Sequence, residues 1–571
     1  MITTKCIKIS NENLDTIKSD IKKHLKVNEI QTYFPILSLF FDFYNDSPTN
    51  FVLNSNFLVK SLIEPIEHKK NDSYIKFFFK ANILNQSNNE SFNKNIFVKI
   101  LPILNVSQSM TNDYKLDHNS SLPNIFSSLT SKKLNNYNNS AYIDSFFSYL
   151  GSVLTEKGKC PTFPLFFGTF TGVADEFMYD ITEEYSSIKR TSWFKKYNNK
   201  LFTLNNVDLD NEDKIELNSN STNSLKTNHS DTSTNLSELV VDESIELDEE
   251  EPVDNIVEEP NIEEDSDIEI LEEPNIEEEE DSDNIVEEEE DSDIEILEEN
   301  GYMSGDSLDL NDIRMCNYDT ISIDSSSNLS LSSSDMYEIN YCCFKNYPVQ
   351  LNCIEMLKYT LDNYIDKTNN NIPEVEWKSI LFQTCFGLSV AQKHYDFVHN
   401  DLHSSNIMFK ETKLDYLYFN FKGTYFKIPT FGKISKIIDF GRATFNYKKH
   451  VFFSDVFRKH GEAEGQYSYP YYNNLDKCKI KPNKSFDLSR LATTIIEHFE
   501  TDSDIYKLLK LWCMDKYGNF LMDLEDDFNL YRIIAKNVKS AIPKNQINKL
   551  IFKEFIVEKD SISEGDYIYN Y

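Results

Sequence analysis

Two short polar motifs, each bounded by apolar segments, constrain the fold of this chain most strongly. The first, residues 399–406, contains Asp401 and Asn406 and lies between two strand-like segments. The second, residues 436–441, is an apolar run that ends at Asp439. Short apolar runs bounded by polar residues are typical of buried strands. Carboxylate and amide oxygens suit hard cations such as Mg²⁺, so we expect rigid, oxygen-rich loops at both motifs.

A long acidic tract interrupts the chain. The length of 571 residues suggests two to four domains, and the tract lowers this expected number. Residues 236–300 carry 33 Asp and Glu and no Lys or Arg. The formal net charge is −37 for the whole chain and −4 for the residues outside this tract. The octapeptide at 266–273 recurs at 292–299. Such self-repelling repeats cannot bury enough apolar surface to offset their ordering entropy. We therefore predict a disordered acidic insert over residues 205–336.

The hydrophobic periodicity differs on the two sides of this insert. Before it, β-rich runs at 74–80 and 95–104 predict a small antiparallel sheet, and helical spacing of aromatic residues predicts a helix at 140–155. After it, a buried-type strand at 347–356 precedes mainly helical sequence, including a long helix at 375–395. The predicted fold class is α+β. The predicted divisions are a helical N-terminal extension (1–66), a β-rich lobe (67–204), the insert (205–336), a strand with a helical lobe (337–540) and a C-terminal tail (541–571).

Cysteine usage and hydropathy predict the compartment. The chain has nine cysteines at irregular spacing, without a Cys-x-x-Cys pair. Its most apolar N-terminal run, residues 34–41, is too short to span a bilayer, and no signal peptide is evident. We expect an intracellular protein with reduced thiols and no membrane contact. The absence of a basic stripe also argues against nucleic-acid binding.

The two polar motifs resemble those of a known enzyme family. Residues 398–406 read Val-His-Asn-Asp-Leu-His-Ser-Ser-Asn, and residues 438–441 read Ile-Asp-Phe-Gly. Both resemble eukaryotic-type protein kinases, in a divergent form similar to serine/threonine kinases of giant DNA viruses. The likeness covers roughly residues 70–200 and 337–530. It implies a two-lobed fold with ATP and Mg²⁺ bound between the lobes and, for a viral protein, a place in the host cytoplasm or the virion.

The resemblance assigns roles to residues of the two motifs. It implies that Asp401 is the catalytic base and that Asn406 and Asp439 are magnesium ligands, with His399 and His403 in support. Asp401 and Asn406 are alternatively a capping and turn pair. The two histidines are four residues apart and could face one metal on a helix, but the sequence shows no obvious third ligand.

Further roles follow outside the motifs. Lys99 matches the strand lysine that binds the ATP phosphates, and Asp144 is the best candidate for its acidic partner. Backbone groups of Glu355 and Leu357 would bind adenine, and Asp487 would support the catalytic loop from a later helix. Alternatively, Lys99 is an ordinary solvent-facing lysine and Asp144 belongs to the polar face of its helix.

The chain departs from the family pattern at several points. No glycine precedes Gly151, so the Gly-rich loop over the ATP phosphates is absent. Phe97 stands where the family has a small residue against adenine, and Asn400 replaces the arginine of the catalytic loop. No Ala-Pro-Glu follows the second motif, and residues 411–432 are additional between the motifs.

These observations favour an ATP-dependent phosphotransferase that acts on Ser or Thr of a protein substrate. A first alternative is a pseudokinase scaffold, because the missing glycines and Phe97 would weaken nucleotide binding. A second is a small-molecule kinase of the choline or aminoglycoside type. The acidic insert is most simply a solvated linker, and it is alternatively a binding segment for a basic protein partner.

Overall fold

The computed structural model describes residues 6–8, 11–41, 51–66, 77–114, 122–124, 132–208, 338–458, 461–467, 482–524 and 527–571. The acidic tract at 236–300 and most of the predicted insert therefore lie outside the described residues. The prediction of disorder for that segment concerns residues outside these ranges.

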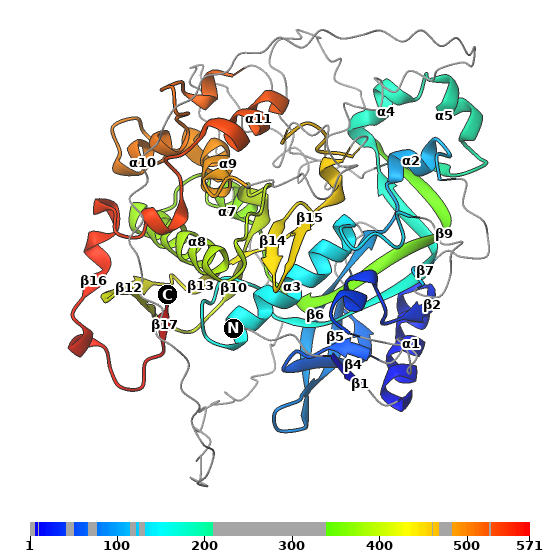
Figure 1. Ribbon diagram of the computed structural model, residues 1–571, viewed down its shortest axis with the longest axis horizontal. Helices are drawn as coiled ribbons and strands as arrows, with labels where there is room; N and C mark the ends of the chain where they lie inside the picture. Colours follow the sequence, from blue (N-terminus) through cyan, green and yellow to red (C-terminus); the bar gives the residue numbers. More distant parts are fainter. Residues whose placement is uncertain are drawn as a thin grey trace, which may run out of the picture. The chain divides into compact units, whose positions relative to one another are not determined.

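The largest sheet is antiparallel and has seven strands, which come from both sides of the insert. The strand order is β2-β7-β9-β6-β5-β4, and β8 also pairs with β9. Figure 1 shows β7 and β9 as long, curved strands that run side by side. The strands are β2 (Val27–Gln31), β4 (Phe57–Pro65), β5 (Phe77–Asn85), β6 (Glu90–Pro102), β7 (Phe166–Asp180), β8 (Thr203–Asp208) and β9 (Glu338–Glu355).

The two ends of the insert are held together by this sheet. Asp208, the last residue of β8, is paired with Glu338, the first residue of β9. Sequence before and after the insert therefore contributes to one sheet. Because β9 lies between β7 and β6, most of its residues are buried, as expected for a central strand.

The structure confirms the two predicted strands before the insert and differs in the N-terminal segment. The runs at 74–80 and 95–104 correspond to β5 and β6, which pair in antiparallel fashion. Where we expected a helical extension at 1–66, the structure has one long helix, α1 (Asn11–Leu25), together with β2 and β4. These two strands occupy the two outer positions of the large sheet. Their buried apolar residues belong to the main hydrophobic core, so this segment is part of the sheet.

Helix α3 (Ser140–Glu156) confirms the predicted helix and connects the sheet to the polar motifs. The side chain of Asn139 accepts a hydrogen bond from Ala141 N–H and caps its first turn. Phe147 of this helix stacks on Phe397, with ring centroids 4.0 Å apart, and also contacts the ring of Phe440. One apolar cluster thus joins α3 to the segments that carry both motifs.

The second half is mainly helical, with the motifs attached to a short strand pair. Strand β10 (Ile407–Glu411) follows the first motif, and β13 (Lys433–Ile437) precedes Asp439; the two strands pair in antiparallel fashion. This pairing places the end of the first motif beside the start of the second. The helices of this half are α7 (Leu361–Lys367), α8 (Glu374–Tyr395), α9 (Phe486–Ile495), α10 (Asp504–Trp512) and α11 (Asp527–Asn537).

The additional residues between the motifs form a hairpin that holds the C-terminus. Strands β11 (Tyr416–Phe421) and β12 (Thr424–Pro429) pair with each other and with β17 (Ile568–Asn570) and β16 (Ile556–Val557). The predicted C-terminal tail thus completes a four-stranded sheet. The remaining elements are β1 (Cys6–Lys8), β3 (Phe51–Leu53), α2 (Val106–Met110), α4 (Thr182–Ile188), α5 (Ser192–Tyr197), β14 (Thr444–Tyr447) and β15 (His450–Phe453).

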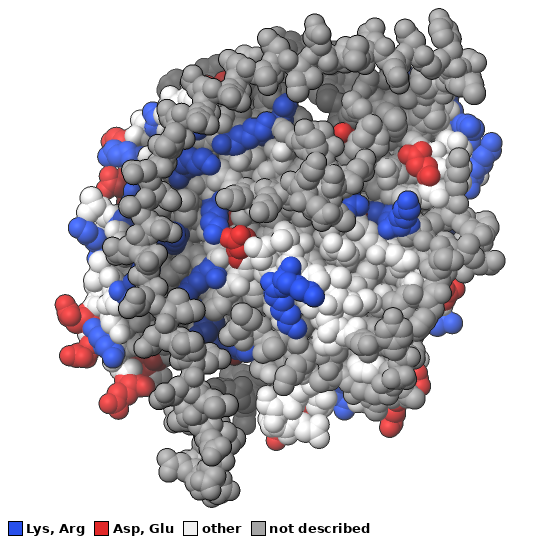
Figure 2. All heavy atoms as spheres, in the orientation of Figure 1, with Lys and Arg blue, Asp and Glu red and all other residues white. Residues whose placement is uncertain are grey.

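Charge is distributed differently in the described residues and in the acidic tract. Figure 2 shows Lys and Arg side chains spread over one face of the molecule, with scattered Asp and Glu among them. The formal charge of −4 outside residues 236–300 agrees with this mixed surface. The strong acidity of the whole chain is therefore a property of the tract.

Candidate active site

Lys99 lies between two carboxylates that come from distant parts of the chain. Its Nζ is 2.7 Å from Oδ2 of Asp144 on α3 and 3.0 Å from Oδ1 of Asp439. Burial acts to lower the pKa of Lys99, but the two carboxylates together raise it above its usual value. The lysine is therefore held charged. The structure brings together Lys99, Asp439 and Asp144, to which the resemblance assigned phosphate binding, metal binding and pairing with the lysine.

Asp439 is the exposed member of this group. About half of its side chain is exposed (50%), compared with 2% for Asp144. Although burial acts to raise the pKa of Asp439, Lys99, His399 and His403 lower it below its usual range. Asp439 also adopts a positive φ of 64°, a conformation that Asp enters more readily than most residues. The Asp439 carboxylate is therefore ionised and partly accessible to solvent.

The carboxylate of Asp487 on α9 binds the backbone of the first motif. The two oxygens of this carboxylate accept hydrogen bonds of 3.0 Å from the backbone N–H groups of His399 and Asn400. Burial raises the pKa of Asp487 to about 6, while the charge of His399 and these N–H bonds lower it. Asn400 has a positive φ of 65°, so the loop turns sharply where it is anchored. This is the geometry expected for a residue that supports the loop.

The two histidines of the motif contact different partners. His399 Nε2 is 2.8 Å from the carbonyl oxygen of Ile438, which connects the two motifs directly. His403 Nε2 is 3.1 Å from the amide nitrogen of Asn406. Each ring thus stabilises the loop at its own position. The alternative in which both histidines face one metal is not the arrangement that the structure has.

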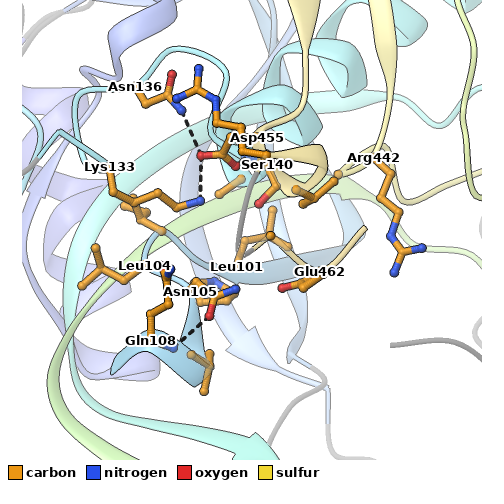
Figure 3. A pocket seen from close by; sticks show the side chains of 18 of the residues that line it. Leu101, Leu104, Asn105, Gln108, Lys133, Asn136, Ser140, Arg442, Asp455 and Glu462 are labelled. Carbon is orange, nitrogen blue, oxygen red and sulfur yellow. Dashed lines mark hydrogen bonds and ion pairs between the residues drawn. The ribbon is translucent and has the colours of Figure 1, made fainter. Parts of the chain in front are cut away.

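Asp401, Asn406 and Asp439 line one cavity of about 510 Å³. Figure 3 shows another part of its lining, where Lys133 and Asn136 bind Asp455, and Arg442 lies at the side. The cavity combines the candidate base with both candidate metal ligands. It continues along the end of β6 and the start of α3.

The donor set of this cavity fits a magnesium ion. The amide nitrogen of Asn406 is 2.9 Å from the carbonyl oxygen of Asp401 and 3.1 Å from His403 Nε2. These bonds use the nitrogen, so the Asn406 Oδ1 is the atom that would ligate a cation. Together with the ionised Asp439 carboxylate, it supplies the hard oxygen ligands that Mg²⁺ prefers.

Asp455 attaches the segment after the second motif to the start of α3. One of its oxygens binds Lys133 Nζ at 2.7 Å and the Asn136 amide at 2.9 Å. Its other oxygen accepts the N–H of Ser140 at 3.2 Å, so the carboxylate caps the helix that carries Asp144. Nothing in the local sequence around Asp455 indicated this contact, since its partners lie more than 300 residues earlier.

The Glu355 side chain has a role that sequence reasoning missed. Its carboxylate is 2% exposed and lies 2.5 Å from Lys410 Nζ and 3.5 Å from Lys436 Nζ. Although burial opposes ionisation, Lys436, Lys410 and Lys94 lower the pKa of Glu355 to about 2. Burial lowers the pKa of Lys436 to about 8, although Glu355 opposes that change. This charge cluster holds the end of β9.

The backbone at the end of β9 limits the predicted adenine contacts. The N–H of Glu355 donates to the carbonyl oxygen of Leu165 at 2.9 Å. This backbone N–H is therefore not available to adenine. Leu357 is buried, with 7% of its surface exposed. Most of the connection between β4 and β5, residues 67–76, lies outside the described ranges.

Tyr531 of α11 is a second residue that sequence reasoning missed. Its hydroxyl donates to Oδ1 of Asp401 at 2.8 Å and accepts from Nε of Arg490 at 2.8 Å. Arg442 Nε is 3.6 Å from the other oxygen of Asp401. The candidate base is thus held by a tyrosine that stands 130 residues later in the chain.

Comparison with known proteins supports a divergent kinase. No protein-family model matches the chain. It is 35% identical to serine/threonine-protein kinase haspin of Bos taurus over 102 residues, which are 18% of this chain and 13% of that protein. It is 37% identical to the haspin homolog of Arabidopsis thaliana over 81 residues, 14% of each protein.

These similarities cover a small part of either protein. The chain spans only 13% and 14% of the length of these two relatives, whose names describe serine/threonine kinases. They support a kinase-type phosphotransferase and do not show the likeness to viral kinases that the sequence suggested. Within the described ranges, every helix is too short or too polar to cross a bilayer.

Proposed function

We propose that the chain is an ATP- and Mg²⁺-dependent phosphotransferase that transfers the γ-phosphate to a Ser or Thr hydroxyl of a protein. The observation that supports this most strongly is that Asp401, Asn406 and Asp439 line one cavity, while Lys99 on β6 forms an ion pair with Asp439. These residue types in this order are what phosphoryl transfer requires.

Each residue has a role that its position supports. The charged Nζ of Lys99 would neutralise the phosphates of ATP. Asp439 and Asn406 would hold Mg²⁺, which supplies charge neutralisation on the transferred group. Asp401 would accept the hydroxyl proton as the acceptor oxygen bonds to γ-phosphorus and the bond to the ADP oxygen breaks. Catalysis then depends on positioning and electrostatics, with no covalent enzyme intermediate.

The division into lobes is part of this proposal. Residues 67–204 and the first part of 337–540 would bind the nucleotide, and the helical remainder would bind the acceptor. The acidic tract at 236–300 would stay outside the chemistry and serve as a linker or as a binding segment for a basic protein. Its charge alone supports the second role.

The test is γ-phosphate transfer by the full-length protein with Mg-ATP. Mixed proteins, choline and an aminoglycoside are offered as separate acceptors to the wild type and to Asp401→Asn. We expect transfer to Ser or Thr of proteins that falls at least about a thousandfold in the variant, while nucleotide binding is retained. Transfer to the small alcohols alone would identify a small-molecule kinase. Nucleotide binding without any transfer would identify a pseudokinase.

A further inference from the structure

A buried amide stands directly beside the lysine of the site. In the register of the large sheet, Asn352 of β9 is paired with Lys99 of β6 on one side and with Thr169 of β7 on the other. Residues paired directly across antiparallel strands project from the same face of the sheet. Lys99, Asn352 and Thr169 therefore form one row, and this row faces α3.

Asn352 contacts the acidic partner of Lys99. Its amide nitrogen donates to Oδ1 of Asp144 at 2.9 Å. Its carbonyl oxygen is 2.7 Å from the hydroxyl of Ser145 and 2.7 Å from the hydroxyl of Thr169. A carboxylate only accepts hydrogen bonds, so the amide must present its nitrogen to Asp144, and the two hydroxyls fix the opposite end. The whole Asn352 side chain is buried.

The two oxygens of Asp144 have separate tasks. Oδ2 accepts from Lys99 at 2.7 Å and from the N–H of Phe440 at 3.0 Å. Oδ1 faces Asn352, and its other contact, with the hydroxyl of Ser148, is long at 3.4 Å. Without Asn352, the buried Oδ1 would lack a strong donor. Rotation of the carboxylate toward another donor would then draw Oδ2 away from Lys99.

We propose that Asn352 is a positioning residue that fixes the Asp144 carboxylate and thereby holds Lys99 ready for the phosphates of the nucleotide. This inference rests on the proposed function, because it names Lys99 as the phosphate-binding group.

The test compares two substitutions on the same strand. Asn352→Leu removes the donor to Asp144, while the hydroxyls of Ser145 and Thr169 keep second acceptors in the carbonyl oxygens of Ala141 and Leu351. Gln350→Leu is the matched control. Gln350 is equally buried and bonds to Thr169, but its bonds do not involve Asp144.

The first readout is Mg-ATP affinity, measured by calorimetry on the full-length protein. We expect Asn352→Leu to weaken binding about tenfold, because a buried hydrogen bond to a charged group is lost. Gln350→Leu should lower the melting temperature but leave affinity within about twofold of the wild type. In the background of Lys99→Met, Asn352→Leu should have no further effect on affinity. Equal affinity of wild type and Asn352→Leu, or an undiminished effect without Lys99, would overturn the inference.

A second readout does not depend on nucleotide. In a crystal structure of Asn352→Leu, we expect the Asp144 carboxylate to be rotated and its contact with Lys99 to be lost. An unchanged Lys99–Asp144 distance of 2.7 Å would overturn the inference even if no nucleotide binds. If the wild type binds Mg-ATP but transfers no phosphate, the proposed function fails, while both readouts still decide the role of Asn352.

Discussion

The hydroxyl of Tyr531 donates a hydrogen bond of 2.8 Å to Oδ1 of Asp401, and both side chains are buried. The same hydroxyl accepts a bond from Arg490, so its proton is directed to the carboxylate. Oδ1 of Asp401 is thereby occupied, and Oδ2 lies 3.6 Å from Arg442 Nε. Tyr531 thus fixes the orientation of the candidate base.

Removal of this hydroxyl should slow phosphate transfer without changing nucleotide binding. We expect Tyr531→Phe to lower kcat about tenfold, since a hydrogen bond to a charged group is lost, and to leave the KM for ATP within about twofold. Steady-state kinetics separate the two constants. Tyr506→Phe on α10 is the control for loss of a tyrosine hydroxyl elsewhere. A wild-type kcat in Tyr531→Phe would remove Tyr531 from the site.

Lengthening Asp144 to glutamate should reduce activity. Asp144 is 2% exposed and already contacts Lys99 and Asn352 at 2.7 and 2.9 Å. An added methylene has no free space there, and such overpacking costs about 1–3 kcal/mol. We expect Asp144→Glu to lower both the melting temperature and kcat/KM for ATP. Asp366→Glu, at a partly exposed site on α7, is the control, and a gain in activity in Asp144→Glu would refute the packing argument.

Metal dependence should follow Asp439. Chelation by EDTA should abolish transfer, and added Mg²⁺ should restore it. We expect Asp439→Asn to raise the Mg²⁺ concentration for half-maximal activity at least about tenfold, because a charged ligand becomes a neutral one. Glu411→Gln, which removes a charge outside the cavity, should keep the wild-type requirement. An unchanged requirement in Asp439→Asn would exclude this carboxylate as a ligand.

The pH dependence of stability should reveal Asp487. Burial raises its pKa to about 6, compared with about 4 in the unfolded chain. Between these values the folded state retains a proton that the unfolded state has released. This group therefore makes the free energy of unfolding fall as pH rises from about 4 to about 6, by on the order of 2–3 kcal/mol.

Activity should change in the opposite direction over the same range. Protonation of Asp487 leaves fewer acceptors for the N–H groups of His399 and Asn400, so the loop loosens and activity falls below pH 6.

The predicted change in stability is measured by denaturant unfolding of the wild type and Asp487→Asn at several pH values, because Asn does not titrate. A difference in stability between the two proteins that stays constant from pH 4 to 7 would disprove the assignment.

Local sequence was sufficient to predict the parts of the site that depend on neighbouring residues. The spacing within 399–406 and the apolar run before Asp439 predicted two loops bounded by strands. The structure has β10 after the first loop and β13 before the second, while Val398 before the first loop forms only an isolated bridge with Thr444. The helical spacing at 140–155 predicted α3 and thus placed Asp144. These features follow from the periodicity of side chains along one element.

The contacts across the chain were decided by the tertiary structure alone. Tyr531 reaches Asp401 over 130 positions, and Asp455 reaches Ser140 over 315. The signal for Asn352 was faint: polar Gln350 and Asn352 alternate in an otherwise apolar strand. Sequence determined which residues are chemically able to act. Only the register of β6, β9 and β7 and the packing of α3 and α11 decided which carboxylate oxygens they meet, because hydrogen bonds depend on distances that no local pattern specifies.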